Sequence, residues 1–246
     1  MSRSDNLLSI FLFILTAVLL TLNVLFHMPL AFESSSNIQY VPASKTVILE
    51  SLTLKQKIAQ MVIAYGNEET IKPFQRMAVG GIHLAALPSY DDYTDRINDY
   101  QQDAPLPMFI TVDLEGCINA MENLHPFPTF REIPGPEQAY SLGKEMGNLI
   151  SGLGFTVNFA PVTELDDTIW GCRTFPGTPE EIADMANAFI DGIHEEGILV
   201  TAKHYPGKTL IAQDPHEHLN RAIITEEDLV PFQLVLDEGI DMVMVT

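Results

Sequence analysis

One pattern recurs in the second half of this chain and constrains its fold more than any other feature. An amphipathic helix ends at a glycine, and a short apolar strand follows. In the helix that begins after Thr178, Pro179 and Glu181 supply amino-terminal signals, and apolar residues recur at helical spacing. Repeated units of this kind predict a parallel sheet covered by helices. The predicted copies are helix 136–153 with strand 155–159, helix 178–193 with strand 198–202, and helix 225–238 with strand 242–245.

Apolar segments earlier in the chain predict three more strands, at 61–64, 81–84 and 107–112, for a total of six. No G-x-G-x-x-G segment follows any of them, which argues against a dinucleotide-binding fold. The length of 246 residues is close to the size of a (β/α)8 barrel, about 250 residues. We therefore expect an α/β protein with the (β/α)8, or TIM-barrel, architecture.

The amino-terminal segment has a different character, because residues 7–26 form an uncharged apolar run. As a helix, this run is long enough to cross about 30 Å of hydrocarbon, and it is longer than the apolar part of a cleavable signal peptide. We expect a short cytoplasmic tip and an uncleaved transmembrane signal-anchor in residues 1–32, and a linker in residues 33–50. The domain of residues 51–246 would then lie on the extracytoplasmic side, with secretion after cleavage as the alternative.

The charge balance limits the class of partner. The chain has 13 Lys and Arg residues against 33 Asp and Glu residues, and a formal net charge of −20. Proteins that bind nucleic-acid phosphates concentrate positive charge, so no nucleic-acid partner is expected. Two cysteines are too few for a disulfide-built fold or for a four-cysteine zinc site.

Polar side chains gather where the predicted strands end. Asp113 and Glu115 follow the third strand, Asn158 lies near the end of the fourth, and Lys203 and His204 close the fifth. Arg173 lies in the loop before the helix that begins after Thr178. Because the carboxyl ends of parallel strands meet at one end of a barrel, where barrel enzymes carry their active sites, these residues predict a common site.

Several of these segments resemble family-3 glycoside hydrolases. K-H-Y-P-G at 203–207, followed by D-P-H at 214–216, is similar to that family's K-H-[FY]-P-G and D-S-H, with the same spacing. V-D-L-E-G at 112–116, A-P-V at 160–162, R-T-F at 173–175 and the start at 52–61 are similar as well. The resemblance covers about 51–246 and implies the amino-terminal (β/α)8 domain of the family, in its β-N-acetylhexosaminidase branch.

The resemblance also implies roles for single residues. His216 would be the general acid/base and Asp214 its partner, while Asp113, Arg173, Lys203 and His204 would hold the hydroxyls of the terminal sugar. The implied reaction is hydrolysis of terminal β-linked N-acetylglucosamine from peptidoglycan-type glycans, by a retaining mechanism and without a metal or other cofactor. A carboxylate two residues from an imidazole in an extended loop can orient that imidazole and stabilise its cation.

The chain departs from the family pattern at its two cysteines. Cys117 replaces the second glycine of V-D-x-E-G-G, and Cys172 precedes Arg173. Both fall on loops predicted to face the site. A disulfide across the rim of the pocket is one interpretation, and two unpaired thiols is the interpretation we favour from the sequence.

A second departure concerns the nucleophile. A retaining glycosidase that acts by covalent displacement needs a nucleophilic carboxylate, which in this family is an Asp after a later strand than 242–245. Asp241 precedes that strand and so belongs to the opposite end of the barrel. We therefore expect the barrel to be truncated after about six strands, and the chain to be inactive alone because the nucleophile lies beyond residue 246.

Two other functions fit the same residues. His204, Asp214, His216 and His218 offer nitrogen and oxygen ligands, so a metal-dependent barrel hydrolase is an alternative. A non-catalytic, membrane-tethered sugar-binding protein is another. The first predicts activity that a chelator abolishes and zinc restores, and the second predicts sugar binding without turnover.

Overall fold

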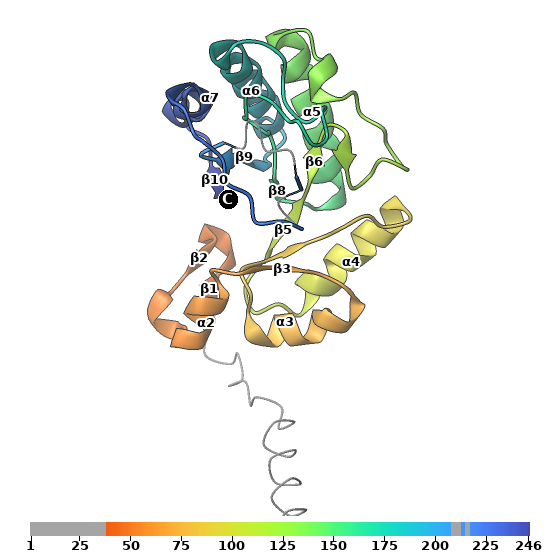
Figure 1. Ribbon diagram of the computed structural model, residues 1–246. Coiled ribbons are helices and arrows are strands. Elements are labelled where there is room, and N and C mark those ends of the chain that lie inside the picture. The colour runs from red at the N-terminus through yellow and green to blue at the C-terminus, as the bar shows by residue number, and fades with distance from the viewer. Residues whose placement is uncertain (1–37, 208–212, 215–216) are drawn as a thin grey trace, which may run out of the picture. The chain divides into compact units, whose positions relative to one another are not determined.

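The computed structural model describes residues 38–207, 213–214 and 217–246 (Figure 1). The predicted tip and transmembrane segment, residues 1–32, lie outside these ranges and stay predictions, as does the structure around His216. Within the described ranges, every helix is too short or too polar to cross a membrane.

Six parallel strands form the main sheet, in the order β10-β9-β8-β5-β4-β3. A strand occurs in each of the six segments predicted to contain one, so the predicted α/β fold with a parallel sheet is confirmed. Successive strands along the chain are neighbours in the sheet, as they are around a (β/α)8 barrel. The strands are β3 (Ile63–Tyr65), β4 (Gly81–His83), β5 (Phe109–Val112), β8 (Val157–Asn158), β9 (Leu199–Tyr205) and β10 (Met242–Val245).

A helix connects each strand to the next, so the alternating pattern of the sequence is kept throughout the sheet. The predicted start of the capped helix is confirmed, because Glu181 N donates to Thr178 Oγ1 (3.3 Å) and Thr178 N to Glu181 Oε2 (2.8 Å). The helices are α2 (Leu54–Ala59), α3 (Ile71–Met77), α4 (Tyr90–Gln102), α5 (Pro136–Leu153), α6 (Pro179–His194) and α7 (Glu226–Asp237).

Helices α5 and α6 pack against each other at two glycines. A side chain at Gly143 would meet the backbone of Phe189, and one at Gly192 would meet the backbone of Tyr140. This close approach needs residues without a Cβ atom. The apolar side chains beneath these helices, together with those of the strands, form one buried core, which leaves the polar residues at the strand ends as the lining of a separate site.

Two short hairpins lie outside the main sheet and were not predicted. β1 (Tyr40–Val41) pairs with β2 (Thr46–Val47), within residues expected to be linker, and β6 (Leu114–Glu115) pairs with β7 (Ile118–Asn119). Strands of two residues are too short to show an alternating pattern in the sequence. The second hairpin turns at Gly116, whose φ of +77° suits glycine, and it follows directly from the end of β5.

Candidate active site

A pocket of about 420 Å³ lies at the carboxyl ends of the strands, where the sequence predicts the site. Both edge strands contribute to its wall, Ile63 and Tyr65 from β3 and Met244 from β10, so the sheet curls around the pocket. The predicted residues Asp113, Arg173, Lys203 and His204 all line it. The remaining lining residues are His83, Glu115, Ile118, Phe159 and Trp170.

Lys203 forms the floor of this pocket. Its side chain is 2% exposed, and its Nζ donates to Asp113 Oδ1 at 2.7 Å and is also paired with Glu115 Oε1. A buried ammonium group needs such partners, because its desolvation is costly. Burial alone would raise the pKa of Asp113, but the charge and hydrogen bond of Lys203 outweigh it and hold that pKa below its usual range. Asp113 is therefore an ionised acceptor at neutral pH, and its side chain is 30% exposed.

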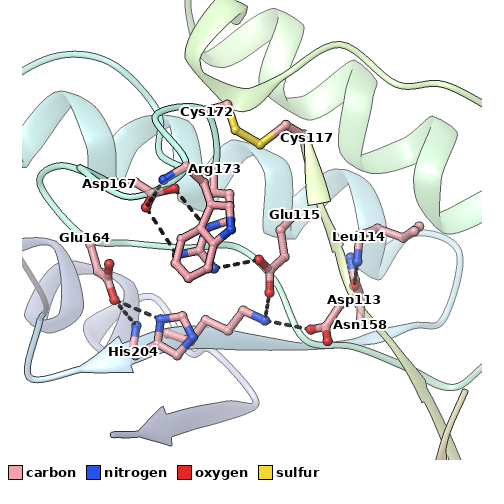
Figure 2. Close-up of polar contacts among 12 residues, drawn as sticks. Asp113, Leu114, Glu115, Cys117, Asn158, Glu164, Asp167, Cys172, Arg173 and His204 are labelled. Carbon is pink, nitrogen blue, oxygen red and sulfur yellow. Dashed lines mark hydrogen bonds and ion pairs between the residues drawn. A yellow bond between two sulfur atoms is a disulfide. The ribbon is translucent and has the colours of Figure 1, made fainter. Parts of the chain in front are cut away.

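Arg173 forms one wall and is held from two sides. Its Nε and Nη2 donate to the two oxygens of Asp167 (2.8 and 3.3 Å), and its Nη1 donates to Glu115 Oε2 (2.9 Å) (Figure 2). The guanidinium carbon lies 3.9 Å from the centre of the Trp170 ring. Burial would lower the pKa of Arg173, but the hydrogen bonds and charges of Asp167 and Glu115 raise it. Arg173 therefore holds Glu115, Asp167 and Trp170 together in this wall and also contributes a positive charge.

His204 is oriented by a buried carboxylate. Glu164 Oε1 lies 2.8 Å from His204 Nδ1 and accepts the backbone N–H of His204 at 3.1 Å (Figure 2). A carboxylate on one ring nitrogen sets the orientation of the imidazole and favours the tautomer with its proton on Nδ1, which leaves Nε2 as an acceptor. These two contacts with Glu164 hold the His204 ring in one orientation in the pocket lining.

His83 is a lining residue that our sequence analysis missed. Its Nδ1 lies 2.9 Å from Thr111 Oγ1, and its Nε2 lies 3.5 Å from Asp113 Oδ2. The ring stacks on Phe159 and meets Tyr65 edge-on, at centroid distances of 5.6 and 4.9 Å. Burial lowers the pKa of His83 despite the nearby Asp113 charge. The signal in the sequence was a histidine at the end of an apolar strand, which is weak by itself.

Three acidic residues contact the predicted lining residues. The sequence places Glu115 after the third strand beside Asp113 but assigns it no role, and Glu164 and Asp167 were not singled out, although each contacts a predicted residue directly. The cluster of Glu164, Asp166 and Asp167 after the fourth strand was the available signal. Its pairing with Arg173 and His204 depends on the course of a long loop, which periodicity does not reveal.

Cys117 and Cys172 form a disulfide, with a Cα–Cα distance of 5.8 Å (Figure 2). The favoured interpretation of two unpaired thiols was wrong. The two residues lie 55 apart in the sequence, and they meet because the β6–β7 hairpin and the loop before α6 both fold over the same end of the sheet. That distance lies within the usual range for disulfides.

The structure describes only part of the loop that carries the predicted acid/base pair. Asp214 is described, and its carbonyl oxygen accepts the backbone N–H groups of Glu217 and His218, at 3.2 and 3.0 Å. It is not a lining residue of the pocket, His218 is exposed, and His216 lies outside the described residues. In the part of the chain that the structure describes, no three His, Cys, Asp or Glu residues are grouped to hold a metal ion.

Asp241 lies where its sequence position predicts, away from the pocket. It precedes β10, its Oδ2 lies 2.7 Å from His194 Nε2, and the same oxygen accepts the backbone N–H of Val200 at 2.9 Å. These contacts hold the amino-terminal ends of the strands together. Asp241 is therefore a structural residue of the opposite end of the sheet.

The fold and the pocket together define a class: an α/β domain of the (β/α)8 type with a pocket lined by charged side chains at the carboxyl ends of its strands. The model of the glycosyl hydrolase family 3 N-terminal domain matches residues 53–246. The chain belongs to this family, as the sequence motifs predict.

Curated relatives and solved structures agree with this assignment. The chain is 28% identical to a β-hexosaminidase of Idiomarina loihiensis, over 76% of this chain and 63% of that protein, and 30% identical to one of Actinobacillus succinogenes, over 70% and 56%. A family-3 glycosyl hydrolase of Mycobacterium smegmatis superposes with a TM-score of 0.70 at 27% identity, over 80% of this chain and 65% of that one. A β-N-acetylglucosaminidase of Paenibacillus superposes with a TM-score of 0.71 at 27% identity, over 79% and 42%. The chain thus spans less than two thirds of the length of each of these proteins.

Proposed function

We propose that this chain carries the sugar-binding and acid/base side of a family-3 β-N-acetylhexosaminidase, which removes terminal β-linked N-acetylglucosamine from peptidoglycan-type glycans with retention of configuration. The observation that carries the proposal is the pocket floor, where the Asp113 carboxylate and the Lys203 ammonium stand side by side at the base of a pocket of about 420 Å³. Relatives named β-hexosaminidase support the choice of sugar.

The lining suits a neutral, hydroxyl-rich ligand. Asp113 is ionised and partly exposed, so it accepts hydrogen bonds from sugar hydroxyls. Lys203 supplies a donor, and His204, whose Nδ1–H is directed to Glu164, supplies an acceptor at Nε2. Lys203 and Arg173 already have carboxylate partners, so the pocket offers paired hydrogen bonds rather than one strong unbalanced charge. Phe159 and Trp170 add apolar surface on which the face of a sugar ring can pack.

The proposed acid/base is His216, with Asp214 as its partner. His216 gives its proton to the leaving glycosidic oxygen in the first step and takes a proton from the attacking water in the second. This assignment rests on the D-P-H segment and its spacing from Lys203.

The covalent step needs a further carboxylate, which attacks the anomeric carbon from the opposite face of the sugar. Among the described residues, the two carboxylates that line the pocket, Asp113 and Glu115, are both paired with Lys203, and Asp241 belongs to the other end of the sheet. We therefore expect the 246-residue chain to bind N-acetylglucosamine without appreciable turnover.

The proposed location is the extracytoplasmic side of a membrane, with residues 1–32 as the anchor, or the exterior after cleavage of that segment. Support comes from the uncharged run at 7–26 and from the Cys117–Cys172 disulfide, because disulfides persist mainly in oxidising compartments. Protease accessibility of the domain in intact and in lysed cells tests this proposal.

Titration of the purified 246-residue chain with N-acetylglucosamine, followed by calorimetry, tests the binding proposal. We expect saturable binding, which the substitution Asp113→Asn weakens at least tenfold because it removes the charged acceptor. The matched control is Asp166→Asn, in an exposed ion pair with Arg131 outside the pocket lining, which should bind like the parent chain. Absence of saturable binding in the parent chain would refute the proposed sugar site.

A chromogenic N-acetyl-β-glucosaminide tests turnover separately. We expect no release of the chromophore above background. Robust release would refute the expected inactivity of this chain, and release that a chelator abolishes and zinc restores would favour the metal-dependent hydrolase instead.

A further inference from the structure

The Cys117–Cys172 disulfide joins two segments that both build one wall of the pocket. Cys117 lies in the turn of the β6–β7 hairpin, and Cys172 lies in the loop that connects β8 to α6. Four residues that line the pocket lie within two positions of these cysteines. They are Glu115 and Ile118 on the hairpin, and Trp170 and Arg173 on the loop.

The loop has internal contacts that hold its shape. Trp170 N donates to Asp167 Oδ1 at 3.3 Å, and Gly171 N donates to Asp167 O at 2.6 Å. The Arg173 guanidinium donates to the same Asp167 carboxylate. These contacts are all local. They keep Trp170 and Arg173 together, but they do not set the position of the loop relative to the hairpin.

Two links cross from the loop to the hairpin close to the pocket: the disulfide itself and the Arg173 Nη1–Glu115 Oε2 ion pair at 2.9 Å. Glu115 also pairs with Lys203 on the pocket floor. A shift of the hairpin would therefore disturb the wall and the floor together. The hairpin has two residues in each strand, so its own ladder is short.

We propose that the Cys117–Cys172 disulfide is a positioning element of the sugar pocket, which holds the wall of Trp170 and Arg173 against the hairpin and makes ligand affinity sensitive to thiol reductants. This inference rests on the proposed function for the identity of the ligand. Both cysteines are half-buried, so a small reductant can reach them. The Arg173–Glu115 ion pair still joins the two segments after reduction, but no covalent link does.

Opening the disulfide by a dithiol is a two-electron reduction. A thiolate of the reductant attacks one sulfur, the S–S bond breaks, and the second thiol of the reductant displaces the first cysteine. Both cysteine sulfurs end as protonated thiols, and the reductant ends as a cyclic disulfide. No other oxidant or reductant is required.

Trp170 gives a direct measurement of the wall, because it is the single tryptophan of the chain. We would record its emission wavelength and its quenching by acrylamide before and after treatment with dithiothreitol, and in the variant Cys117→Ser/Cys172→Ser. Wavelength and quenching are preferred to intensity, because a nearby disulfide itself changes tryptophan intensity. We expect a red shift and stronger quenching in both opened forms, with an unchanged far-ultraviolet circular dichroism spectrum.

The affinity for N-acetylglucosamine is measured in the same samples. We expect opening of the disulfide to weaken binding about fivefold or more, which corresponds to about 1 kcal/mol. The double Ser variant is the control for the reductant, since dithiothreitol should change neither its fluorescence nor its affinity. A substitution outside both segments provides a second control: Lys144→Met, at the exposed ion pair with Glu195, should keep the emission wavelength and the affinity of the parent chain.

The outcomes separate this inference from the proposed function. Unchanged Trp170 emission and quenching after reduction would overturn the positioning role, whatever the ligand. A changed Trp170 signal with unchanged sugar affinity would also overturn it, because the wall would then move without consequence. If no form binds the sugar while Trp170 responds to reduction, the proposed sugar site fails, whereas the positioning of the wall by the disulfide is supported.

Discussion

Two lysine–carboxylate ion pairs of this protein have nearly the same N–O distance, but the lysine of one is buried and the lysine of the other is exposed. Lys203 Nζ lies 2.7 Å from Asp113 Oδ1 on the pocket floor, and Lys144 Nζ lies 2.6 Å from Glu195 Oε2, between α5 and α6. The Lys203 side chain is 2% exposed and that of Lys144 is 49% exposed. Distance is therefore a poor guide to the weight of an ion pair. Water solvates the partners of an exposed pair after one is removed, whereas a buried partner is left without compensation.

The strongest test of this comparison is Lys203→Met. It leaves the buried Glu115 carboxylate short of one cation and removes the neighbour that holds the pKa of Asp113 low. We expect the free energy of unfolding to fall by about 3–5 kcal/mol, with loss of sugar binding. Urea unfolding followed by circular dichroism measures the first effect and calorimetry the second.

Partial rescue gives the matched control for that variant. Adding Glu115→Gln to Lys203→Met removes the uncompensated charge, so part of the lost stability should return while sugar binding stays absent. If Lys203→Met were no more damaging than a substitution at Lys144, burial would not decide the weight of these pairs.

The disulfide should have the next largest effect, for a reason that does not depend on burial. Cys117 and Cys172 are 55 residues apart, and a cross-link of that span removes a large part of the freedom of the unfolded chain. We expect its reduction to lower the free energy of unfolding by about 4 kcal/mol. Urea unfolding with and without dithiothreitol measures this, and equal midpoints would contradict it.

A smaller effect is expected from the pH dependence of His83. Burial lowers the pKa of His83 below its value of 6.5 in an unfolded chain, so the unfolded chain binds the proton more readily. His83 therefore contributes stability above pH 6.5 that is lost as pH falls below 6.5 and through its folded pKa. Its ring contacts Thr111, Asp113, Phe159 and Tyr65, and the charges of Lys203 and Glu115 also act on its pKa.

Unfolding midpoints measured as a function of pH check this, in the parent chain and in His83→Gln. The variant should show a flatter profile just below pH 6.5, and His125→Gln, at a half-exposed histidine on the surface, is the control. The lowered pKa of Asp113 has the same sign in a more acidic window, because its stabilisation is lost only as pH falls below about 3.9, the usual value for Asp. A profile that His83→Gln leaves unchanged would contradict the assignment.

The smallest expected effect is that of Lys144→Met. Glu195 keeps its hydrogen bond from Tyr140 Oη at 2.6 Å, and water replaces the lost ammonium group. We expect no measurable change in the unfolding midpoint or in sugar affinity. If Lys144→Met lowered the free energy of unfolding nearly as much as Lys203→Met, burial would not explain the difference between the two pairs.

Most of the sheet and the location of the site were predictable because the signals are local. Thr178 and Glu181 mark the start of α6 within four residues, and the polar residues at the ends of several apolar strands together mark the pocket end of the sheet. The supporting acids were harder to predict. Glu164 and Asp167 lie in a loop without regular structure, and their roles depend on how that loop returns to Arg173 and His204.

The sequence by itself determined the alternation of strands and helices, the caps of the helices, and the family, because each depends on residues close together in the chain or on a short motif. Only the tertiary structure decided the partners: Lys203 with Asp113, His204 with Glu164, and Cys117 with Cys172, at separations of 90, 40 and 55 residues. Periodicity reports which face of an element is buried. It does not report which distant group is buried against that face, because this depends on the order of the strands and the course of the loops between them.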